Sequence, residues 1–165
     1  MTIDTWNTMT LTAARKLQEL THEMDRYRWN ILRRCETRWK NFGETTEEGH
    51  KVYFSGKEDK HEHGVGFLVH KDIVNTVMGS RPVSSRLITI RLRAVPFNIT
   101  IVQAYAPTSD YDDKEIEYSM TSYRTSLIRH RRRTFLLCKE TVMQNWARML
   151  VETGKAFVDP SAMTT

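Results

Sequence analysis

Three polar side chains each follow a short run of mostly apolar residues, and their types fit chemistry on a phosphate group. They are Asn7, Glu36 and Tyr105. A short buried strand that ends in such a residue places the side chain at the rim of a sheet. Oxygen ligands at a rim can hold a hard cation and contact a phosphate. The pattern therefore indicates phosphodiester chemistry.

Each of these residues also has an ordinary structural explanation. A lone glutamate at the end of a strand is most often a solvated rim residue, and a tyrosine before Ala-Pro is usually part of the core. Only the joint pattern of Asn7, Glu36 and Tyr105 favours a site.

Two other clusters carry metal-ligating side chains. One consists of His61, Glu62 and His63. Because lysines surround it, it is more typical of a solvated hairpin loop than of a transition-metal site. The other consists of Asp110, Asp112, Asp113 and Glu115. It lacks the glycine and the terminal glutamate of an EF-hand loop, and it favours the start of a helix instead.

Apolar periodicity predicts the elements that would position these residues. A helix is expected over Ala13–Tyr27, where Leu17, Leu20 and Met24 share one face. Strand periodicity is present in the runs Ile3–Asn7, Asn30–Glu36, Lys51–Phe54, Val65–Val69, Leu87–Leu92 and Ile99–Ala104.

These elements predict a helix packed on a sheet. Lys51–Phe54 and Val65–Val69 are expected to form a hairpin. We expect residues 3–106 to form one mixed sheet with the helix against it. Asn7, Glu36 and Tyr105 should then meet at one edge.

The composition is that of a globular domain. The chain has 165 residues, of which 39% are apolar and 27% are charged. No stretch approaches the roughly 18 apolar residues of a spanning helix, and no basic-then-apolar leader opens the sequence. Cys35 and Cys138 form no disulfide framework and have no second cysteine at metal-ligand spacing. A nuclear or cytoplasmic location without a membrane segment is expected.

The net charge of +5 is confined to the later part of the chain. Residues 1–118 contain 17 Lys and Arg against 17 Asp and Glu, whereas residues 119–165 contain 8 against 3. Binding to nucleic acid by charge would therefore depend on the segment around Arg131, Arg132 and Arg133. Such binding without catalysis is the alternative function.

In their order and spacing, the Trp-Asn at Asn7, the Cys-Glu-Thr at Glu36 and the Ala-Tyr-Ala-Pro at Tyr105 resemble motifs of the exonuclease–endonuclease–phosphatase superfamily. The likeness is to the endonuclease domain of non-LTR retrotransposons and to craniofacial development protein 2-like proteins, and it covers roughly residues 3–117. It implies an α/β (α+β) fold, the first half of a four-layer α/β sandwich with two mixed sheets face to face and helices outside. It also implies cleavage of DNA phosphodiesters with Mg²⁺ or Mn²⁺.

The resemblance gives each candidate residue a role. Glu36 matches the family's metal-ligating glutamate, whose carboxylate is the kind of oxygen ligand that Mg²⁺ takes. Asn7 matches the asparagine that hydrogen-bonds near the metal and the scissile phosphate. Tyr105 matches the tyrosine whose hydroxyl touches the phosphate.

Two departures from the family pattern predict an inactive chain. Arg33 and Arg34 stand where the family has apolar residues, so at least one should point inward, where an unpaired cation costs several kcal/mol. The family's Gly-Asp-x-Asn loop, a further Asp and a closing Asp-His pair are absent from the sequence, which removes the general acid–base groups. We expect a truncated endonuclease-like domain over residues 1–117 and a basic, poorly packed tail over residues 118–165. A nuclease that borrows its missing half from a partner is the third interpretation.

The tail also fits a retrotransposon reading frame translated one base out of register from about Tyr118. The genetic code permits a set of codons for Arg131–Gln144 that gives a different peptide when the reading frame is moved back by one base. That peptide is Pro-Lys-Lys-Asp-Ile-Leu-Val-Val-Gln-Gly-Asp-Cys-Asn-Ala. That reading contains the missing loop. As translated, the tail predicts a helix over Asp112–Arg133 and another around Val142–Gly154.

Overall fold

The computed structural model describes residues 1–5, 14–35, 37–59, 64–105, 121, 125 and 134–138. The described helices are α1 (Ala14–Tyr27) and the 3-10 helix η1 (Lys71–Thr76). The described strands are β1 (Ile3–Thr5), β2 (Ile31–Cys35), β3 (Phe42–Glu47), β4 (His50–Ser55), β5 (Val65–Val69), β6 (Val77–Ser84), β7 (Leu87–Leu92), β8 (Ile99–Ala104) and β9 (Thr134–Cys138).

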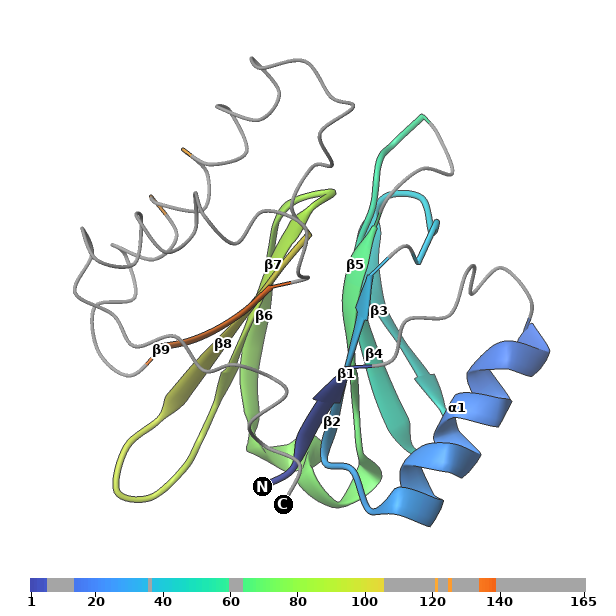
Figure 1. Ribbon diagram of the computed structural model, residues 1–165, viewed down its shortest axis with the longest axis vertical. Coiled ribbons are helices and arrows are strands. Elements are labelled where there is room, and N and C mark those ends of the chain that lie inside the picture. The colour runs from blue at the N-terminus through green and yellow to red at the C-terminus, as the bar shows by residue number, and fades with distance from the viewer. Residues whose placement is uncertain are drawn as a thin grey trace.

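These strands form two sheets, not the single mixed sheet expected over residues 3–106 (Figure 1). The first sheet has the order β1-β2-β5-β4-β3 and the second has the order β6-β7-β8-β9. The single-sheet prediction is wrong because a period of two shows which residues share a face, but not which strands are neighbours. One sheet with one helix would also leave its second apolar face uncovered.

The predicted elements themselves are confirmed within a few residues of their expected ends. The expected hairpin is formed by β4 and β5, which run antiparallel with Val52 opposite Leu68. β1 is parallel to β2, and β2 is antiparallel to β5. β7 and β8 are antiparallel neighbours in the second sheet.

Helix α1 covers the outer face of the first sheet (Figure 1). Its buried side chains recur at helical spacing, as the sequence predicted, and they pack on side chains from β2, β4 and β5. This outer cluster consists of Leu17, Leu20, Met24, Leu32, Val52 and Leu68. Each fully buried leucine or methionine of this kind contributes about 1.5–3 kcal/mol, so the contact fixes the helix on the sheet.

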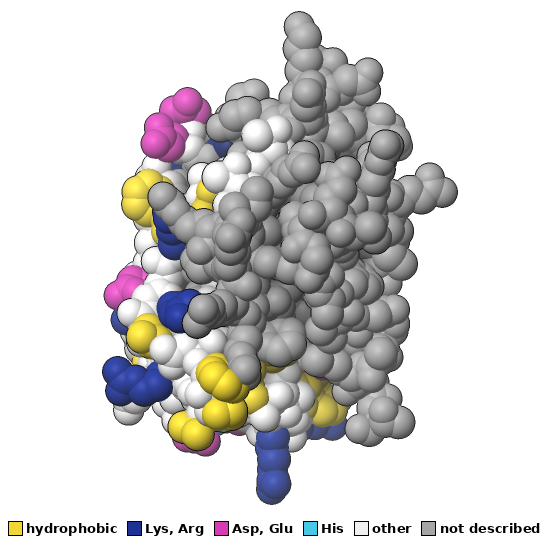
Figure 2. Space-filling view, turned by 90° about the vertical axis from the view of Figure 1, so that its left-hand side faces the viewer, with side chains coloured by type: hydrophobic (Ala, Val, Ile, Leu, Met, Phe, Trp, Pro, Cys, Tyr) yellow, Lys and Arg dark blue, Asp and Glu magenta, His cyan; other side chains and the backbone are white. Residues whose placement is uncertain are grey.

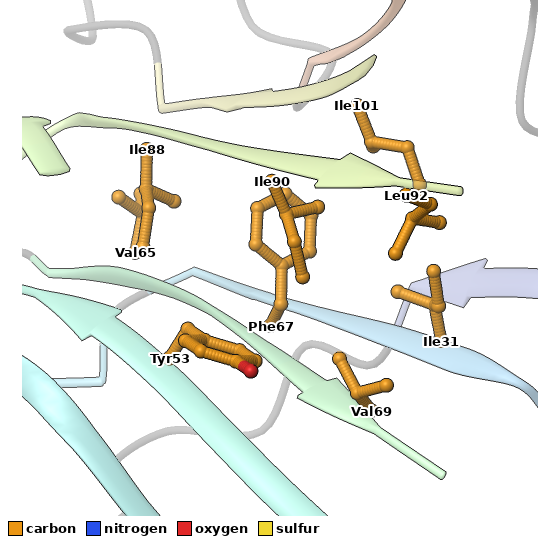
Figure 3. Packing of buried hydrophobic residues seen from close by; sticks show 9 residues of the cluster. All are labelled: Ile31, Tyr53, Val65, Phe67, Val69, Ile88, Ile90, Leu92 and Ile101. Carbon is orange, nitrogen blue, oxygen red and sulfur yellow. The ribbon is translucent and has the colours of Figure 1, made fainter. Parts of the chain in front are cut away.

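The inner faces of the two sheets pack on each other and form the main core. Figure 3 shows Ile88 and Ile90 of β7 pointing toward Val65 and Phe67 of β5. The rest of this inner core consists of Ile31, Tyr53, Val69, Leu92 and Ile101. Ile88, Ile90 and Leu92 thus share one face of β7, as the periodicity of Leu87–Leu92 implies, and this face packs on the opposite sheet.

Three strands were not predicted. β3 carries few apolar residues, β6 shows no alternation of apolar and polar residues, and both strands are exposed or half-buried. β9 lies in the segment expected to be a tail and pairs in parallel with β8, with Thr134 opposite Thr100 and Cys138 opposite Ala104. A part of the chain beyond Tyr118 thus joins the second sheet.

The expected tail helices lie mostly outside the described residues. Thr121 and Thr125 are helical, and the hydroxyl of Thr125 donates to the carbonyl of Thr121 at 2.9 Å. Both fall within the helix expected over Asp112–Arg133. The helix expected around Val142–Gly154 lies wholly outside.

Exposed hydrophobic side chains are scattered over the described surface. On the face in Figure 2 they lie among Lys and Arg side chains, and several of them gather near the lower edge of the view. The exposed large hydrophobic residues of β6 and of the β7–β8 loop are Met78, Val83, Val95 and Phe97. No described helix is long and apolar enough to cross a membrane.

Candidate functional site

The carboxyl ends of β2 and β8 meet at one end of the sandwich, although these strands belong to different sheets. Gln103 of β8 donates from Nε2 to the Sγ of Cys35, the last residue of β2, at 2.9 Å. Both side chains are buried. Tyr105, which follows β8, therefore lies at the same end of the sandwich as Cys35, the last residue of β2.

Backbone hydrogen bonds join the connections at this end. Thr37 N donates to Gly64 O at 3.2 Å, and Gly64 N donates to Ser85 O at 3.2 Å. Tyr105 N donates to Arg86 O at 2.8 Å. We call the residues in these bonds the strand-end rim. Because the bonds connect segments of both sheets and satisfy buried backbone groups, they hold the rim as a unit.

Tyr105 belongs to the strand-end rim through its backbone bond to Arg86. It is half-buried, and its ring packs against the inner core. The guanidinium carbon of Arg86 lies 5.4 Å from the ring centroid, within the range of a cation–π interaction. The ring is thus held from two sides, while the predicted contact of its hydroxyl with a phosphate stays a prediction.

Asn7 and Glu36 lie outside the described residues. Their neighbours in the chain are described: Thr5 of β1 pairs in parallel with Arg33 of β2, so both strands run toward the strand-end rim. The structure therefore brings together the described parts of the three strands that lead to the predicted site. The meeting of the three side chains stays a prediction.

Arg33 and Arg34 are both buried, which confirms that at least one of them faces the core. Arg33 Nη1 donates to Gln103 Oε1 at 3.5 Å across the sandwich. Alternation along β2 places Arg34 on the opposite face, which Leu32 shares with α1. Burial lowers the pKa of Arg34 to about 10, so this guanidinium stays charged at neutral pH.

The described side chains beside the strand-end rim do not by themselves form a magnesium site. Mg²⁺ prefers carboxylate and water oxygens in an octahedral arrangement. The side-chain contacts found here join a thiol, an amide and guanidinium groups. Within the described ranges, no three His, Cys, Asp or Glu ligands gather at this end. Glu36 would have to supply the first carboxylate.

A different group of metal-ligating side chains does come together. Asp25 lies near the end of α1, His50 begins β4 and His70 follows β5. Their ligand atoms all lie within 4.8 Å of one another. His70 N donates to Asn30 O at 2.9 Å, directly before β2. This Asp25–His50–His70 cluster therefore lies at the opposite end of β2 from the strand-end rim.

A two-residue turn positions His50. Glu48 and Gly49 have φ angles of 49° and 83°, and two positive φ values in succession are typical of the type I′ turn, whose twist suits a hairpin. The side chain of Glu48 also accepts a hydrogen bond from Thr21 Oγ1 of α1 at 3.0 Å. The turn thus anchors the start of β4 beneath the last turns of α1, where Asp25 is.

The cluster is linked mainly through Asp25. His70 Nδ1 accepts from Asp72 N at 3.2 Å, so its proton resides on Nε2, which lies 2.8 Å from Asp25 Oδ1. Lys71 Nζ donates to Asp25 Oδ2 at 2.9 Å. His50 Nε2 is 3.4 Å from Asp25 Oδ1, and the two histidine rings meet edge to face.

These contacts shift two pKa values. The hydrogen bond from Lys71, with a smaller contribution from His70, lowers the pKa of Asp25 to about 2. Burial lowers the pKa of His50 below its ordinary value, although the Asp25 carboxylate and the Glu48 backbone oppose this shift. The folded protein therefore favours an ionised Asp25 and a neutral His50.

The stability of metal-free protein should fall as the pH drops from about 7 to about 5. Because the folded pKa of His50 is depressed, the stabilisation by neutral His50 is complete above the ordinary value of 6.5 and is lost below it. Urea denaturation across this range, with a chelator present, measures the effect. Asp25 adds a further loss as the pH falls from 3.8 toward about 2.

The matched control for this pH effect is His50→Gln, in which the titrating ring is gone. Its stability should depend less on pH over the same range, whatever its absolute stability. Equal slopes for the two proteins would contradict a depressed His50 pKa.

Sequence reasoning did not find this cluster, because its members come from three separate elements at no motif spacing. The available signal was a histidine directly after the buried run Val65–Val69 and another directly before a strand. The clusters that the sequence did single out, His61–His63 and Asp110–Glu115, lie outside the described residues.

Comparison with known sequences identifies distant relatives. No family model matches the chain. Over 114 residues it is 32% identical to craniofacial development protein 2 of Tragulus javanicus and of Bos taurus. The match covers 69% of this chain, but 20% and 19% of those proteins. The chain thus spans about a fifth of the length of the curated relatives it matches.

Solved structures match over more of the chain. The endonuclease domain of TRAS1, a telomere-specific non-LTR retrotransposon, has a TM-score of 0.63 at 14% identity and is matched over 92% of this chain and 70% of that one. The 3′ phosphatase NExo from Neisseria, bound to a product DNA hairpin, has a TM-score of 0.65 at 14% identity with the same coverage. The AP endonuclease LMAP from Leishmania major has a TM-score of 0.58 at 15% identity and is matched over 77% of this chain and 47% of that one.

The two facing sheets, with α1 on the outer face of the first, agree with these matches. β9 also agrees with them, because it pairs with the second sheet although it lies after residue 117, where the likeness to the family was expected to end. The chain has the fold of the exonuclease–endonuclease–phosphatase superfamily and is a distant homologue of craniofacial development protein 2.

Proposed function

We propose that this chain is a retrotransposon-derived, nuclease-like domain that does not itself cleave DNA. The ancestral reaction is metal-dependent hydrolysis of DNA phosphodiesters. The observation that carries the proposal is the burial of both Arg33 and Arg34 immediately before the predicted metal ligand Glu36.

Buried guanidinium groups work against a divalent cation in two ways. Like charges repel, and the repulsion is stronger in a partly buried site than in water. In addition, the last residues of β2 are engaged by a neutral amide, since Gln103 contacts both Arg33 and Cys35. The positive charge beside the end of β2 is thus already supplied by the Arg33 guanidinium, which is held by Gln103.

The position of β9 supports the reading-frame part of the proposal. Thr134–Cys138 coincides with the stretch that reads Asp-Ile-Leu-Val-Val in the shifted frame, and both readings are rich in apolar residues. The Gly-Asp-x-Asn loop that follows in the shifted frame is absent from the translated sequence. The division into a domain over residues 1–117 and a tail over 118–165 belongs to this proposal, as does a nuclear or cytoplasmic location.

The purified chain should show no nicking of supercoiled plasmid or abasic duplex DNA with Mg²⁺ or Mn²⁺. A single carboxylate from Glu36 offers too few fixed oxygens for a metal that needs near-ideal octahedral ligands. The assay compares the chain, its Glu36→Gln variant and an active AP endonuclease as the positive control. Equal, background-level nicking by the chain and the variant is the expected result.

Metal-dependent nicking that disappears in Glu36→Gln would overturn the inactive interpretation. A second comparison tests the cause. If restoring the register after Tyr118, supplying the rest of the domain and replacing Arg33 and Arg34 with apolar residues yields no cleavage, the reading-frame explanation fails.

Binding of DNA without cleavage is the alternative, and it is favoured by the excess of Lys and Arg in residues 119–165. It predicts affinity that falls steeply with salt. Neutralising Arg131, Arg132 and Arg133 to glutamine leaves the β9 sequence intact and would reduce that salt dependence. Affinity that is unchanged by these substitutions would argue against the alternative.

A further inference from the structure

His50 is a fully buried side chain whose polar atoms are poorly satisfied. Its side chain is 0% exposed, and neither ring nitrogen forms a hydrogen bond of ordinary geometry with a described residue. Burial of a polar group without a partner is costly, so such groups in native proteins need an explanation. Asp25 Oδ1 lies 3.4 Å from His50 Nε2.

We propose that the Asp25–His50–His70 cluster binds a zinc ion through His50 Nε2, His70 Nε2 and Asp25 Oδ1. Two imidazoles and one carboxylate form a donor set that suits Zn²⁺ and not Mg²⁺. Water completes the fourth position, since Asp25 faces solvent with 42% of its side chain exposed. The site is separate from the strand-end rim and independent of whether the chain cleaves DNA.

Two of the three distances between the ligand atoms are close to those around a tetrahedral ion, and all three lie within 4.8 Å. Ligand atoms about 2.0–2.1 Å from zinc are about 3.3 Å apart in a tetrahedral arrangement. His50 Nε2 and Asp25 Oδ1 are already 3.4 Å apart. His70 Nε2 and Asp25 Oδ1 are 2.8 Å apart, a hydrogen bond that must open by about half an ångström when the ion takes the place of the proton.

The surroundings of His70 can support the change that zinc requires. Zinc on Nε2 moves the ring proton to Nδ1, and a metal-bound histidine usually donates that proton to a carboxylate or carbonyl. The hydrogen bond from Asp72 N to Nδ1 is then lost, and Asp72 Oδ2, which lies 3.4 Å from Nδ1, is placed to accept the new proton. The ring proton of His70 thus moves from Nε2 to Nδ1.

Lys71 orients the third ligand. Its Nζ holds Asp25 Oδ2 at 2.9 Å, which leaves Oδ1 free to bind the ion through one oxygen. Together the ligands connect the end of α1, the start of β4 and the segment between β5 and η1. The ion would therefore connect the outer helix to the first sheet. It should raise the free energy of unfolding by an amount that grows with the ratio of the free zinc concentration to the Kd.

The test is a titration of the full, chelator-stripped chain with ZnCl₂, and with Co²⁺ as a spectroscopic probe. We expect one Zn²⁺ per chain, a rise in Tm with zinc, a tetrahedral Co²⁺ absorption spectrum and no competition by Mg²⁺. NMR of the histidine ring nitrogens in the unmodified chain should show His70 changing from the Nε2–H to the Nδ1–H tautomer. This readout does not depend on any variant folding.

Variants distinguish binding at this cluster from binding at His61 and His63. Asp25→Asn and His70→Gln should abolish saturable zinc binding, and Asp72→Asn should weaken it by about 10–100-fold through the ligand's supporting carboxylate. The matched control replaces His61 and His63 with glutamine and should bind as the unmodified chain does.

Several results would overturn the proposal. They are the absence of saturable zinc binding, an unchanged His70 tautomer at zinc saturation, and binding that survives Asp25→Asn and His70→Gln. Binding lost in the control that lacks His61 and His63 would likewise place the ion elsewhere. None of these outcomes bears on the nicking assay, so the two proposals fail separately.

Discussion

Replacing Phe67 with alanine is expected to lower the free energy of unfolding by about 3–5 kcal/mol, the usual range for a phenylalanine removed from a packed core. Phe67 is fully buried in the middle of β5 and points toward Ile90 of the facing sheet (Figure 3). The cavity would lie between two sheets, each held by its own backbone hydrogen bonds, so neither can easily collapse into it. Urea denaturation monitored by tryptophan fluorescence measures the loss.

Phe42→Ala is the matched control, because it removes the same atoms from an exposed position. Phe42 is 65% exposed on the edge strand β3, and its removal should change stability by no more than about 0.5–1 kcal/mol. Similar losses in the two variants would contradict a core formed between the sheets.

Gly56→Ala is the second substitution with a large expected effect, a loss of about 3 kcal/mol or more, at the upper end of the range for overpacking. An added Cβ would lie 1.8 Å from the carbonyl oxygen of Trp39. A backbone atom cannot rotate away, so the two segments must separate, which disturbs the 2.7 Å hydrogen bond from Gly56 N to Asn41 O. For a chain of this size the Tm should fall by roughly 6–12 °C, as differential scanning calorimetry would show.

Gly79→Ala provides the control for the glycine substitution. A Cβ at Gly79 would meet no atom within 4 Å, and its φ is not positive. Alanine there should be neutral or should stabilise by up to about 1 kcal/mol through the unfolded state. A Tm for Gly56→Ala as high as that for Gly79→Ala would show that the chain leaves β4 by a different path.

The sequence predicted the faces of elements better than it predicted their neighbours. Ile88, Ile90 and Leu92 do share a buried face, because alternation is a local property of an extended chain. Which surface covers that face depends on the whole topology, so the expected single sheet was wrong. The same limit explains β3, whose polar residues pair with β4 through the backbone and leave no apolar pattern to read.

The candidate sites divide in a similar way. At the strand-end rim, the sequence singled out Tyr105 because this residue follows a buried strand, and the meeting of Asn7, Glu36 and Tyr105 stays a prediction. The Asp25–His50–His70 cluster was not, since a tight turn at Gly49 and the end of a helix bring its members together from distant parts of the chain. The sequence predicted that at least one of Arg33 and Arg34 points inward, but not that both are buried. Alternation along β2 would allow one of its faces to be solvated, whereas in the structure α1 covers that face.

The parallel pairing of β8 with β9 sets an order of events during synthesis of the protein. Parallel neighbours cannot be joined by a tight turn, and residue 134 leaves the ribosome well after residue 104, at about 5–20 residues per second. Until Thr134–Cys138 emerges, the edge of β8 that β9 later occupies has unpaired N–H and C=O groups beside an apolar face. Such an edge is a template for pairing with another chain. A nascent chain stalled between residues 105 and 134 should therefore be the species most prone to aggregate, and the last described strand protects the newly made protein.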